Sequence, residues 1–147
     1  MLVEGHGLAV RVPQGWEAKI FRHPHGEPTL HAASFALPLR DGEFGAHATT
    51  GMGPGDAFCS VTEYLVDENL TPGVGLFAPA QPRGLEAGEF RLSALMADRP
   101  GQLGVQRFFT ATGRPFCLYA VLGSAAARAR LPELGAVLGS LRIAPRD

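Results

Sequence analysis

This sequence has few of the features that assign a function directly. Only two of its 147 residues are cysteines, too few for the disulfide framework of a small secreted domain. The formal net charge is -1 at pH 7, which offers no excess of positive charge to nucleic acid or to an anionic membrane. No apolar run approaches the ~20 residues that cross a bilayer as a helix. We therefore expect a protein with neither a nucleic-acid partner nor a membrane partner.

Lysine is almost absent as well. Lys19 is the only lysine among the 13 basic residues, and we interpret this bias as the coding preference of a GC-rich bacterial genome. Residues 1–6 lack the basic start and the apolar run of a secretory leader, so we expect a cytoplasmic protein. Cys59 and Cys117 lie in apolar, β-rich runs, and we expect both to be reduced residues of the core.

Glycine and proline are abundant, with 19 and 12 residues respectively. This composition predicts many turns, long loops and a low helix content. The hydrophobic fraction of 46% is nevertheless that of a globular protein. A chain of this length suits one domain over residues 1–147 and is long enough to bury a core without a disulfide or a metal.

The stretch from 104 to 143 carries the strongest structural signal. Residues 104–123 predict two strands joined by a tight turn at Thr112-Gly113. The second of these strands is apolar on both faces, which is typical of a central position in a sheet. A stripe at helical spacing follows, made of Leu131, Leu134, Leu138 and Leu141. Since an interior proline costs about 3 kcal/mol, Pro132 places the start of the packed helix near residue 131, and residues 141–143 predict a closing strand.

Earlier in the chain, apolar and polar residues alternate over residues 8–12 and again over 16–20, with the turn Pro13-Gln14-Gly15 between them. This pattern predicts a hairpin. Residues 29–37 predict a third strand, and 56–65 a fourth, although Asp56 would also suit a helix start. Residues 38–55 and 66–103 are predicted to be loops, although residues 85–96 would also suit a short strand or a helical turn, since Leu92, Leu95 and Met96 lie at helical spacing. The whole indicates an α+β fold, with an antiparallel sheet of about six strands and a C-terminal helix on one face.

Two short motifs resemble a known superfamily. Val12-Pro-Gln-Gly-Trp16 is similar to the opening of PsbP-like domains, and the ending Leu-Gly-Ser-Leu-Arg-Ile at 138–143 is similar to their last helix and strand. The chain also resembles short actinobacterial proteins of that type, at Gly5-His-Gly7, Gly15-Trp-Glu17, residues 104–109 and residues 116–119. The resemblance implies an antiparallel sheet with helices packed on it. It implies a binding or scaffolding role and brings no catalytic residues.

Histidine is the best candidate for chemistry. His23 and His25 flank Pro24 in a turn, and His31 lies in a predicted strand nearby. A His-x-His pair beside a strand can present two imidazoles to one transition metal, with a third ligand from the strand. The competing interpretation is that His23 and His25 are exposed loop residues and His31 is a hydrogen-bonded residue of the sheet.

No other motif supports catalysis or a cofactor. Residues 51–55 resemble a glycine-rich phosphate loop, but they lack its Lys-Ser/Thr pair, and Pro54 removes one backbone donor. The chain has no Gly-x-Ser-x-Gly elbow. Glu63 has no partner carboxylate at a useful spacing for acid–base chemistry. We therefore expect no cofactor.

An arginine-containing strand face is the candidate contact surface. In the register that the tight turn predicts, Arg107 opposes Leu118 and shares a face with Phe109 and Phe116, and Arg114 lies nearby. Arginine and aromatic residues are enriched at protein interfaces, so Arg107, Phe109 and Arg114 are the predicted partner-binding residues. We expect a non-catalytic binding or assembly module that contacts another protein or a second copy as a homodimer. The alternative is a small metal-dependent enzyme using His23, His25 and His31.

Overall fold

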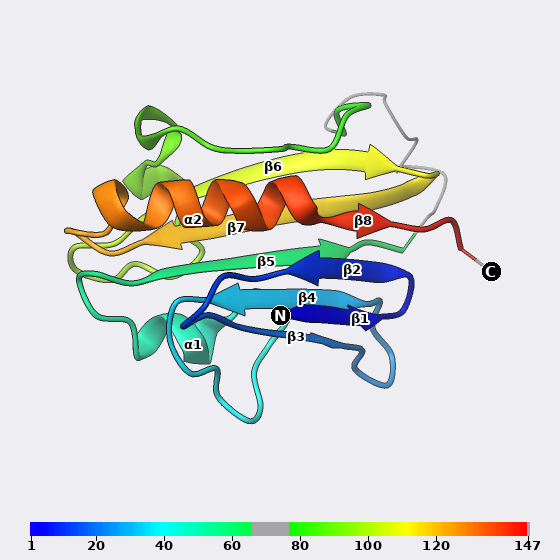
Figure 1. Ribbon diagram of the computed structural model, residues 1–147, viewed down its shortest axis with the longest axis horizontal. Coiled ribbons are helices and arrows are strands. Elements are labelled where there is room, and N and C mark those ends of the chain that lie inside the picture. The colour runs from blue at the N-terminus through cyan, green and yellow to red at the C-terminus, as the bar shows by residue number, and fades with distance from the viewer. Residues whose placement is uncertain (66–76, 147) are drawn as a thin grey trace.

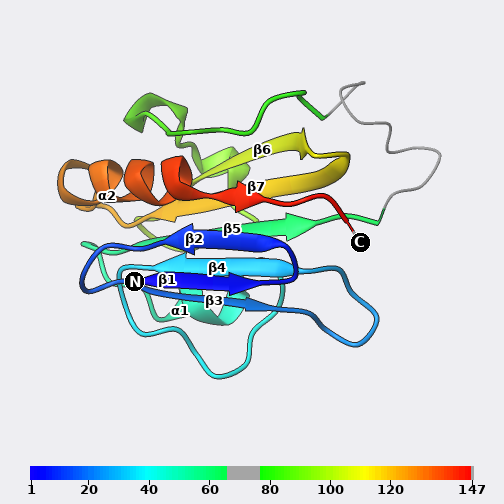
Figure 2. The same ribbon diagram turned by 45° about the vertical axis from the view of Figure 1, so that its right-hand side comes forward.

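The computed structural model describes residues 1–65 and 77–146, which form two layers (Figure 1). The layer in front in that view contains α2 (Ala127–Ser140) and three short strands: β1 (Leu2–Gly5), β2 (Leu8–Arg11) and β8 (Arg142–Ile143). The layer behind it is a sheet of five longer strands: β3 (Glu17–Phe21), β4 (Thr29–Ala33), β5 (Ala57–Glu63), β6 (Leu103–Ala111) and β7 (Arg114–Leu122). The turned view keeps α2, β8 and β2 together in front of the longer strands (Figure 2).

The α+β class, the antiparallel strands and the C-terminal helix are confirmed, but the prediction of a single sheet of about six strands is wrong. One sheet has three strands in the order β1-β2-β8, and the other has five in the order β3-β4-β5-β7-β6. All pairs of these named strands are antiparallel. The chain therefore makes a partial sandwich, in which α2 completes the layer that the small sheet begins.

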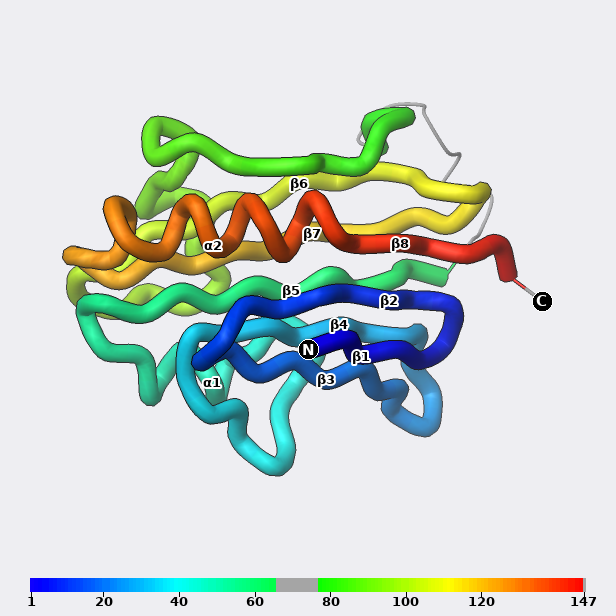
Figure 3. The backbone as a smooth tube through the Cα atoms, viewed as in Figure 1, coloured from blue at the N-terminus to red at the C-terminus, as the bar shows by residue number. Residues whose placement is uncertain are grey.

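The predicted N-terminal hairpin does not form, because β2 has other partners. β2 pairs with β1 from Leu2 opposite Arg11 to Gly5 opposite Leu8. On its other edge it pairs with β8, and Figure 3 shows β8 running directly out of α2 to lie beside β2. The turn after β2 carries the chain to the other sheet. β1 is too short and too exposed for its alternation to be recognised in the sequence.

The hairpin of β6 and β7 agrees with its prediction. Thr112 and Gly113 have φ values of 52° and 79°, the left-handed conformation that a two-residue turn matching the strand twist requires. Arg107 lies opposite Leu118, the predicted register. β7 is hydrogen-bonded to β5 on one side and β6 on the other, and each of its residues is buried, as a strand apolar on both faces predicts.

α2 is longer than predicted, since it begins at Ala127 and contains Pro132 in its interior. Proline has no N–H to donate to the carbonyl four residues earlier, which is that of Arg128. Arg128 is exposed, so water can satisfy its carbonyl and the helix tolerates the proline. The predicted apolar stripe is confirmed: Leu134 and Leu138 of α2 are buried, together with Leu141 just after it.

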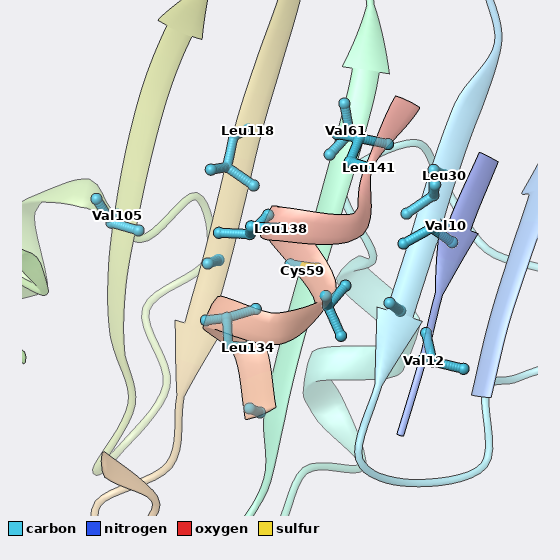
Figure 4. Close-up of a cluster of buried hydrophobic side chains, with 14 of the residues drawn as sticks. Val10, Val12, Leu30, Cys59, Val61, Val105, Leu118, Leu134, Leu138 and Leu141 are labelled. Carbon is cyan, nitrogen blue, oxygen red and sulfur yellow. The ribbon is translucent and has the colours of Figure 1, made fainter. Parts of the chain in front are cut away.

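The main core lies between the two layers. Figure 4 shows Leu134, Leu138 and Leu141 pointing toward side chains of both sheets. The core residues labelled in the figure outside the helix and its end are also apolar. They lie on the two sheets or next to them: Val10, Val12, Leu30, Cys59, Val61, Val105 and Leu118. Because these residues come from both sheets and the helix, burial of apolar surface holds the two layers together.

A smaller cluster covers the opposite face of the large sheet. It combines Phe58, Tyr119 and Val121 with Ala48 from the short helix α1 (Ala46–Thr50). The prediction of a loop without regular structure over residues 38–55 is therefore wrong. α1 is held by tertiary contacts that no local pattern reveals, since the Asp41 carboxylate accepts hydrogen bonds from the backbone of His47 and Ala48 at 2.9 and 2.8 Å.

The predicted loop over residues 66–103 is described only from residue 77 onward. The described part contains two 3-10 turns, η1 (Ala87–Glu89) and η2 (Leu92–Ala94). Single bridges join Ala78 and Arg91 to β6, so this segment runs along the outer edge of the large sheet. Across the described residues, no helix has the length and apolar character needed to cross a bilayer.

Both cysteines are buried and free, as predicted. Cys59 belongs to the core between the layers. Burial raises the pKa of its thiol to about 12, and that of Cys117 to about 11. Since the thiolate is the reactive form of cysteine, these two side chains act as small apolar residues of the core.

Candidate functional site

The three residues predicted to contact a partner lie at different depths. Arg107 forms an ion pair with Glu89 at the surface, and its side chain is 43% exposed. Phe109 is buried, and its ring stacks on that of Phe116 with centroids 5.5 Å apart. Arg114 is only 3% exposed. The strand face that these residues share is part of the core between the layers, so Arg107 alone is accessible to a partner.

The histidines do not come together as a metal site. His31 is buried in β4, whereas His23 and His25 are exposed in the turn before it. The ring of Phe21 packs edge-on against both His23 and His31, with centroid distances of 5.2 and 4.9 Å. Over residues 1–65 and 77–146, no three His, Cys, Asp or Glu side chains are grouped closely enough to hold a metal ion.

His31 is instead a buried, neutral residue of the sheet. Its Nε2 lies 2.8 Å from the carbonyl oxygen of Glu43, and a carbonyl can only accept, so Nε2 carries the proton. Its Nδ1 is buried and has no hydrogen-bond partner within residues 1–65 and 77–146. Burial lowers the pKa of His31 below its ordinary value of 6.5, because desolvation disfavours the charged imidazolium.

The lowered pKa of His31 predicts a loss of stability in acid. Below pH 6.5 His31 takes up a proton in the unfolded chain before it does so in the folded protein, so the free energy of unfolding falls as the pH falls. One such group contributes a slope of up to about 1.4 kcal/mol per pH unit. In His31→Gln, whose side-chain amide can still donate to Glu43, we expect urea unfolding between pH 5 and 6.5 to show a shallower slope. Equal slopes in the two proteins would contradict this assignment.

The most deeply buried charges are those of Glu63 and Arg114. Glu63 ends β5 and Arg114 begins β7, and these antiparallel neighbours bring the two residues to the same end of the large sheet. Arg114 donates from Nε to Glu63 Oε2 at 3.1 Å and from Nη2 to Oε1 at 2.7 Å. The side chains are only 4% and 1% exposed. This two-pronged geometry matches the planar guanidinium to the planar carboxylate.

Arg114 also joins the two layers. Its Nη2 donates to the carbonyl of His6 at 3.0 Å, and its Nη1 donates to that of Ala144 at 2.8 Å. His6 and Gly7 form the turn between β1 and β2, with φ values of 52° and 79°. A Cβ atom on Gly7 would lie 2.6 Å from Nη1 of Arg114. Glycine at position 7 therefore permits both the turn and the close approach of the guanidinium.

A second arginine completes the group. Arg146 donates from Nε to Glu63 Oε2 at 2.7 Å and from Nη2 to Glu27 Oε2 at the longer distance of 3.3 Å. Its side chain is 41% exposed, and that of Glu27 is 17% exposed. Glu27, Glu63, Arg114 and Arg146 form what we call the ion-pair cluster, which runs from the core to the surface.

A hollow of about 460 Å³ opens beside the ion-pair cluster. The segments that border it all lie at the right-hand end of Figure 1: the β1–β2 turn, the β3–β4 loop, the end of β5, the start of β7 and the chain after β8. Three arginines and two glutamates contribute to its lining: Arg22, Arg114, Arg146, Glu27 and Glu63. The other lining residues are His6, Gly7, Pro28, Ala144 and Pro145. We call this cavity the ion-pair hollow.

The charges and functional groups of the lining residues indicate what the ion-pair hollow can bind. It holds three arginines against two glutamates, so its walls carry one positive charge in excess. Arg22, the third arginine, is exposed and donates from Nε to the carbonyl of Gly26 at 2.8 Å. Among the residues that the structure describes, the lining includes no serine, threonine, cysteine, lysine or tyrosine. The arrangement is therefore suited to holding a charged group and offers none of the hydroxyl, thiol or amine nucleophiles.

The sequence contains only partial signals of this site. Gly5-His-Gly7 and Arg114 stand out in the sequence, but the pattern places Arg114 on a contact surface. The sequence around Glu63 shows no partner carboxylate, and the partners of Glu63 in the structure are the two arginines Arg114 and Arg146. Glu63 and Arg114 are 51 positions apart, and no periodicity within one element relates two strand ends so distant in the chain.

Known proteins provide no further guide to the site. No family model matches the chain, and neither a curated protein nor a solved structure matches it significantly.

Proposed function

We propose that this protein is a non-catalytic binding module whose ligand enters the ion-pair hollow. The observation that carries this proposal is the hollow of about 460 Å³, lined by charged side chains from separate segments of the chain. Ligand sites are typically concave, with volumes of about 300–1,000 Å³ and a few convergent polar groups. The ion-pair hollow has that size and brings guanidinium groups together at one end of the sheet.

The rigidity of the surrounding residues supports a binding role. Arg114 is fixed by Glu63 and by the carbonyls of His6 and Ala144. Arg146 is fixed in turn by Glu63. A site whose charged groups are already oriented loses less conformational entropy when a ligand binds. The ion-pair cluster thus holds the walls of the hollow in place before any ligand arrives.

The same bonds argue against catalysis in the ion-pair hollow. Both oxygens of Glu63 accept hydrogen bonds from arginines, so this carboxylate is not positioned to take a proton from a substrate. Together with the absence of hydroxyl, thiol and amine side chains from the described lining, this favours binding over turnover.

The partner we propose is a protein, either a different one or a second copy of this chain. We also retain the proposal that it works in a bacterial cytoplasm. Membership of the PsbP-like superfamily and the metal-dependent enzyme using His23, His25 and His31 both stay predictions. Arg107 is accessible to a large partner, but it lies on β6 and does not line the ion-pair hollow.

A ligand screen monitored by amide NMR tests the binding proposal. The ¹⁵N-labelled protein would be exposed to a set of small acids, amines and neutral compounds. We expect hits to shift the amides of Gly7, Gly26 and Ala144, which lie in or beside the ion-pair hollow. Arg146→Ala should abolish these shifts, because it removes a wall of the hollow at a half-exposed position.

Arg142→Ala is the matched control for that screen. Arg142 is a nearby surface arginine on β8 that bonds only carbonyl groups of its own segment and does not line the ion-pair hollow. The control should leave the shifts unchanged. Hits that map to another surface, or that survive Arg146→Ala, would overturn the proposed function.

A further inference from the structure

We propose that the ion-pair hollow binds the carboxylate group of a ligand, between Arg146 and Arg22, at the position that the Glu27 side chain now occupies on Arg146. This inference rests on the proposed function and specifies the chemical class of the ligand. Glu27 is the internal counterpart of that carboxylate, since its Oε2 accepts a hydrogen bond from Nη2 of Arg146.

The two bonds of Arg146 differ in a way that identifies the replaceable partner. Its hydrogen bond to Glu63 is 2.7 Å long and ends on a side chain that is 1% exposed. Its hydrogen bond to Glu27 is 3.3 Å long and ends on a side chain that is 17% exposed. The contact with Glu27 is near the limit of a hydrogen bond, whereas charge-assisted bonds are usually 2.7–2.9 Å. Glu27 is therefore the weaker partner and the one nearer to solvent.

Unused donors line the same space. Among the described residues, nothing accepts a hydrogen bond from Nη1 of Arg146, and nothing accepts from either Nη atom of Arg22. Arg22 and Arg146 both line the ion-pair hollow. A planar carboxylate can take two parallel hydrogen bonds from a guanidinium, so a ligand carboxylate displacing Glu27 would reach donors that Glu27 leaves unsatisfied.

The charge of the hollow favours an acid over an amine. Glu63 is the only carboxylate deep in the cluster, and both of its oxygens are occupied by Arg114 and Arg146. An ammonium group entering the hollow would meet three arginines, and the less buried of the two glutamates, Glu27, is already paired with Arg146. A carboxylate would instead compensate the positive charge in excess on the walls.

Glu27→Gln provides the decisive experiment, because it removes the internal competitor while preserving the shape of the side chain. Acetate, succinate and a short peptide ending in glutamate would be titrated into the labelled protein, with phosphate and putrescine as comparison probes. We expect the variant to bind acetate and succinate about threefold to tenfold more tightly than the unaltered protein. Arg22→Gln should weaken the same binding about tenfold.

Matched charge changes away from the site control for long-range electrostatics. Glu133→Gln and Arg128→Gln alter the net charge by the same amounts as the test variants, but both positions lie on α2 and do not line the ion-pair hollow. Each should change the affinity less than twofold, because exposed charges farther apart than about 10 Å are screened at ordinary ionic strength.

The probes also separate the possible sources of the carboxylate. Tighter binding of the peptide than of succinate would identify an acidic protein segment, in agreement with the proposed protein partner. The reverse order would identify a small dicarboxylic acid and would contradict the protein partner, although not the carboxylate site. Weaker or unchanged acid binding in Glu27→Gln would overturn the inference, as would a preference for putrescine or for phosphate. In those cases the binding proposal would still stand if the probes shift the amides of Gly7, Gly26 and Ala144. It would fail if no compound shifts them, or if the shifts survive Arg146→Ala.

Discussion

Arg114→Ala is expected to lower the free energy of unfolding by about 3–5 kcal/mol, the range for removing one partner of a buried ion pair. The substitution leaves Glu63 in a site where its side chain is 1% exposed, with only Arg146 to compensate its charge. It also removes the donors to the carbonyls of His6 and Ala144, and with them two of the hydrogen bonds that connect the two layers. Urea denaturation monitored by circular dichroism would measure the change.

Arg107→Ala is the matched control for Arg114→Ala. Arg107 also forms an ion pair with a glutamate, Glu89, but the two side chains are 43% and 33% exposed. Exposed pairs contribute about 0–1 kcal/mol, so the control should unfold at nearly the same urea concentration as the unaltered protein. If the two variants lost similar stability, burial of the Glu63–Arg114 pair would not have the importance assigned to it.

A double variant distinguishes the loss of the whole Glu63–Arg114 ion pair from the cost of leaving Glu63 charged and without Arg114. Arg114→Met combined with Glu63→Gln removes both charges and keeps two side chains of similar volume. Replacing a whole buried pair usually costs far less than breaking it. We therefore expect the double variant to be more stable than Arg114→Ala, although the ion-pair hollow would lose its charged wall and with it any binding of acids.

Gly45→Ala is expected to destabilise the fold by about 3 kcal/mol, from left-handed backbone strain and overpacking together. Gly45 precedes α1 with a φ of 71°. An added Cβ would lie 2.6 and 2.8 Å from the Cε2 and Cε1 atoms of Phe58, a ring that is fully buried against the large sheet. Thermal unfolding of the variant would measure the loss.

Gly113→Ala isolates the backbone contribution to that loss. Gly113 has a similar φ of 79°, but a Cβ atom there would meet nothing within 4 Å. Its cost should be near 1 kcal/mol, from the left-handed conformation alone. The difference between the two variants then measures the packing of Phe58 beneath α1. Equal losses would mean that the Phe58 ring moves aside without cost.

The variants at the ion-pair hollow differ in whether they are expected to affect stability, binding or both. Arg114 and Glu63 support the hollow from within the core, so under the proposed function we expect a change in either to alter both stability and ligand binding. Glu27 and Arg22 lie nearer the surface, and their substitution should change affinity with little effect on unfolding. The protein therefore offers separate positions for testing its architecture and its function.

Local sequence patterns identified the elements whose burial is decided within a few residues. The apolar run of β7 and the tight turn at Thr112-Gly113 predicted the hairpin and its register. The leucine spacing around Leu134 and Leu138 predicted the buried face of α2. In each case the periodic spacing of apolar side chains in a strand or helix can be recognised from residues that are close together in the sequence. The α+β class follows from these elements alone.

Only the tertiary structure decided how the elements are distributed and where the charged site lies. β2 has an alternating pattern that suits either a hairpin with β3 or a sheet with β1 and β8, and the pattern does not distinguish them. Glu63 and Arg114 meet because β5 and β7 are neighbours, and the β1–β2 turn then closes over them. Alternation reports which face of a strand is buried, but strand order and the pairing of distant charges depend on the packing of the whole chain.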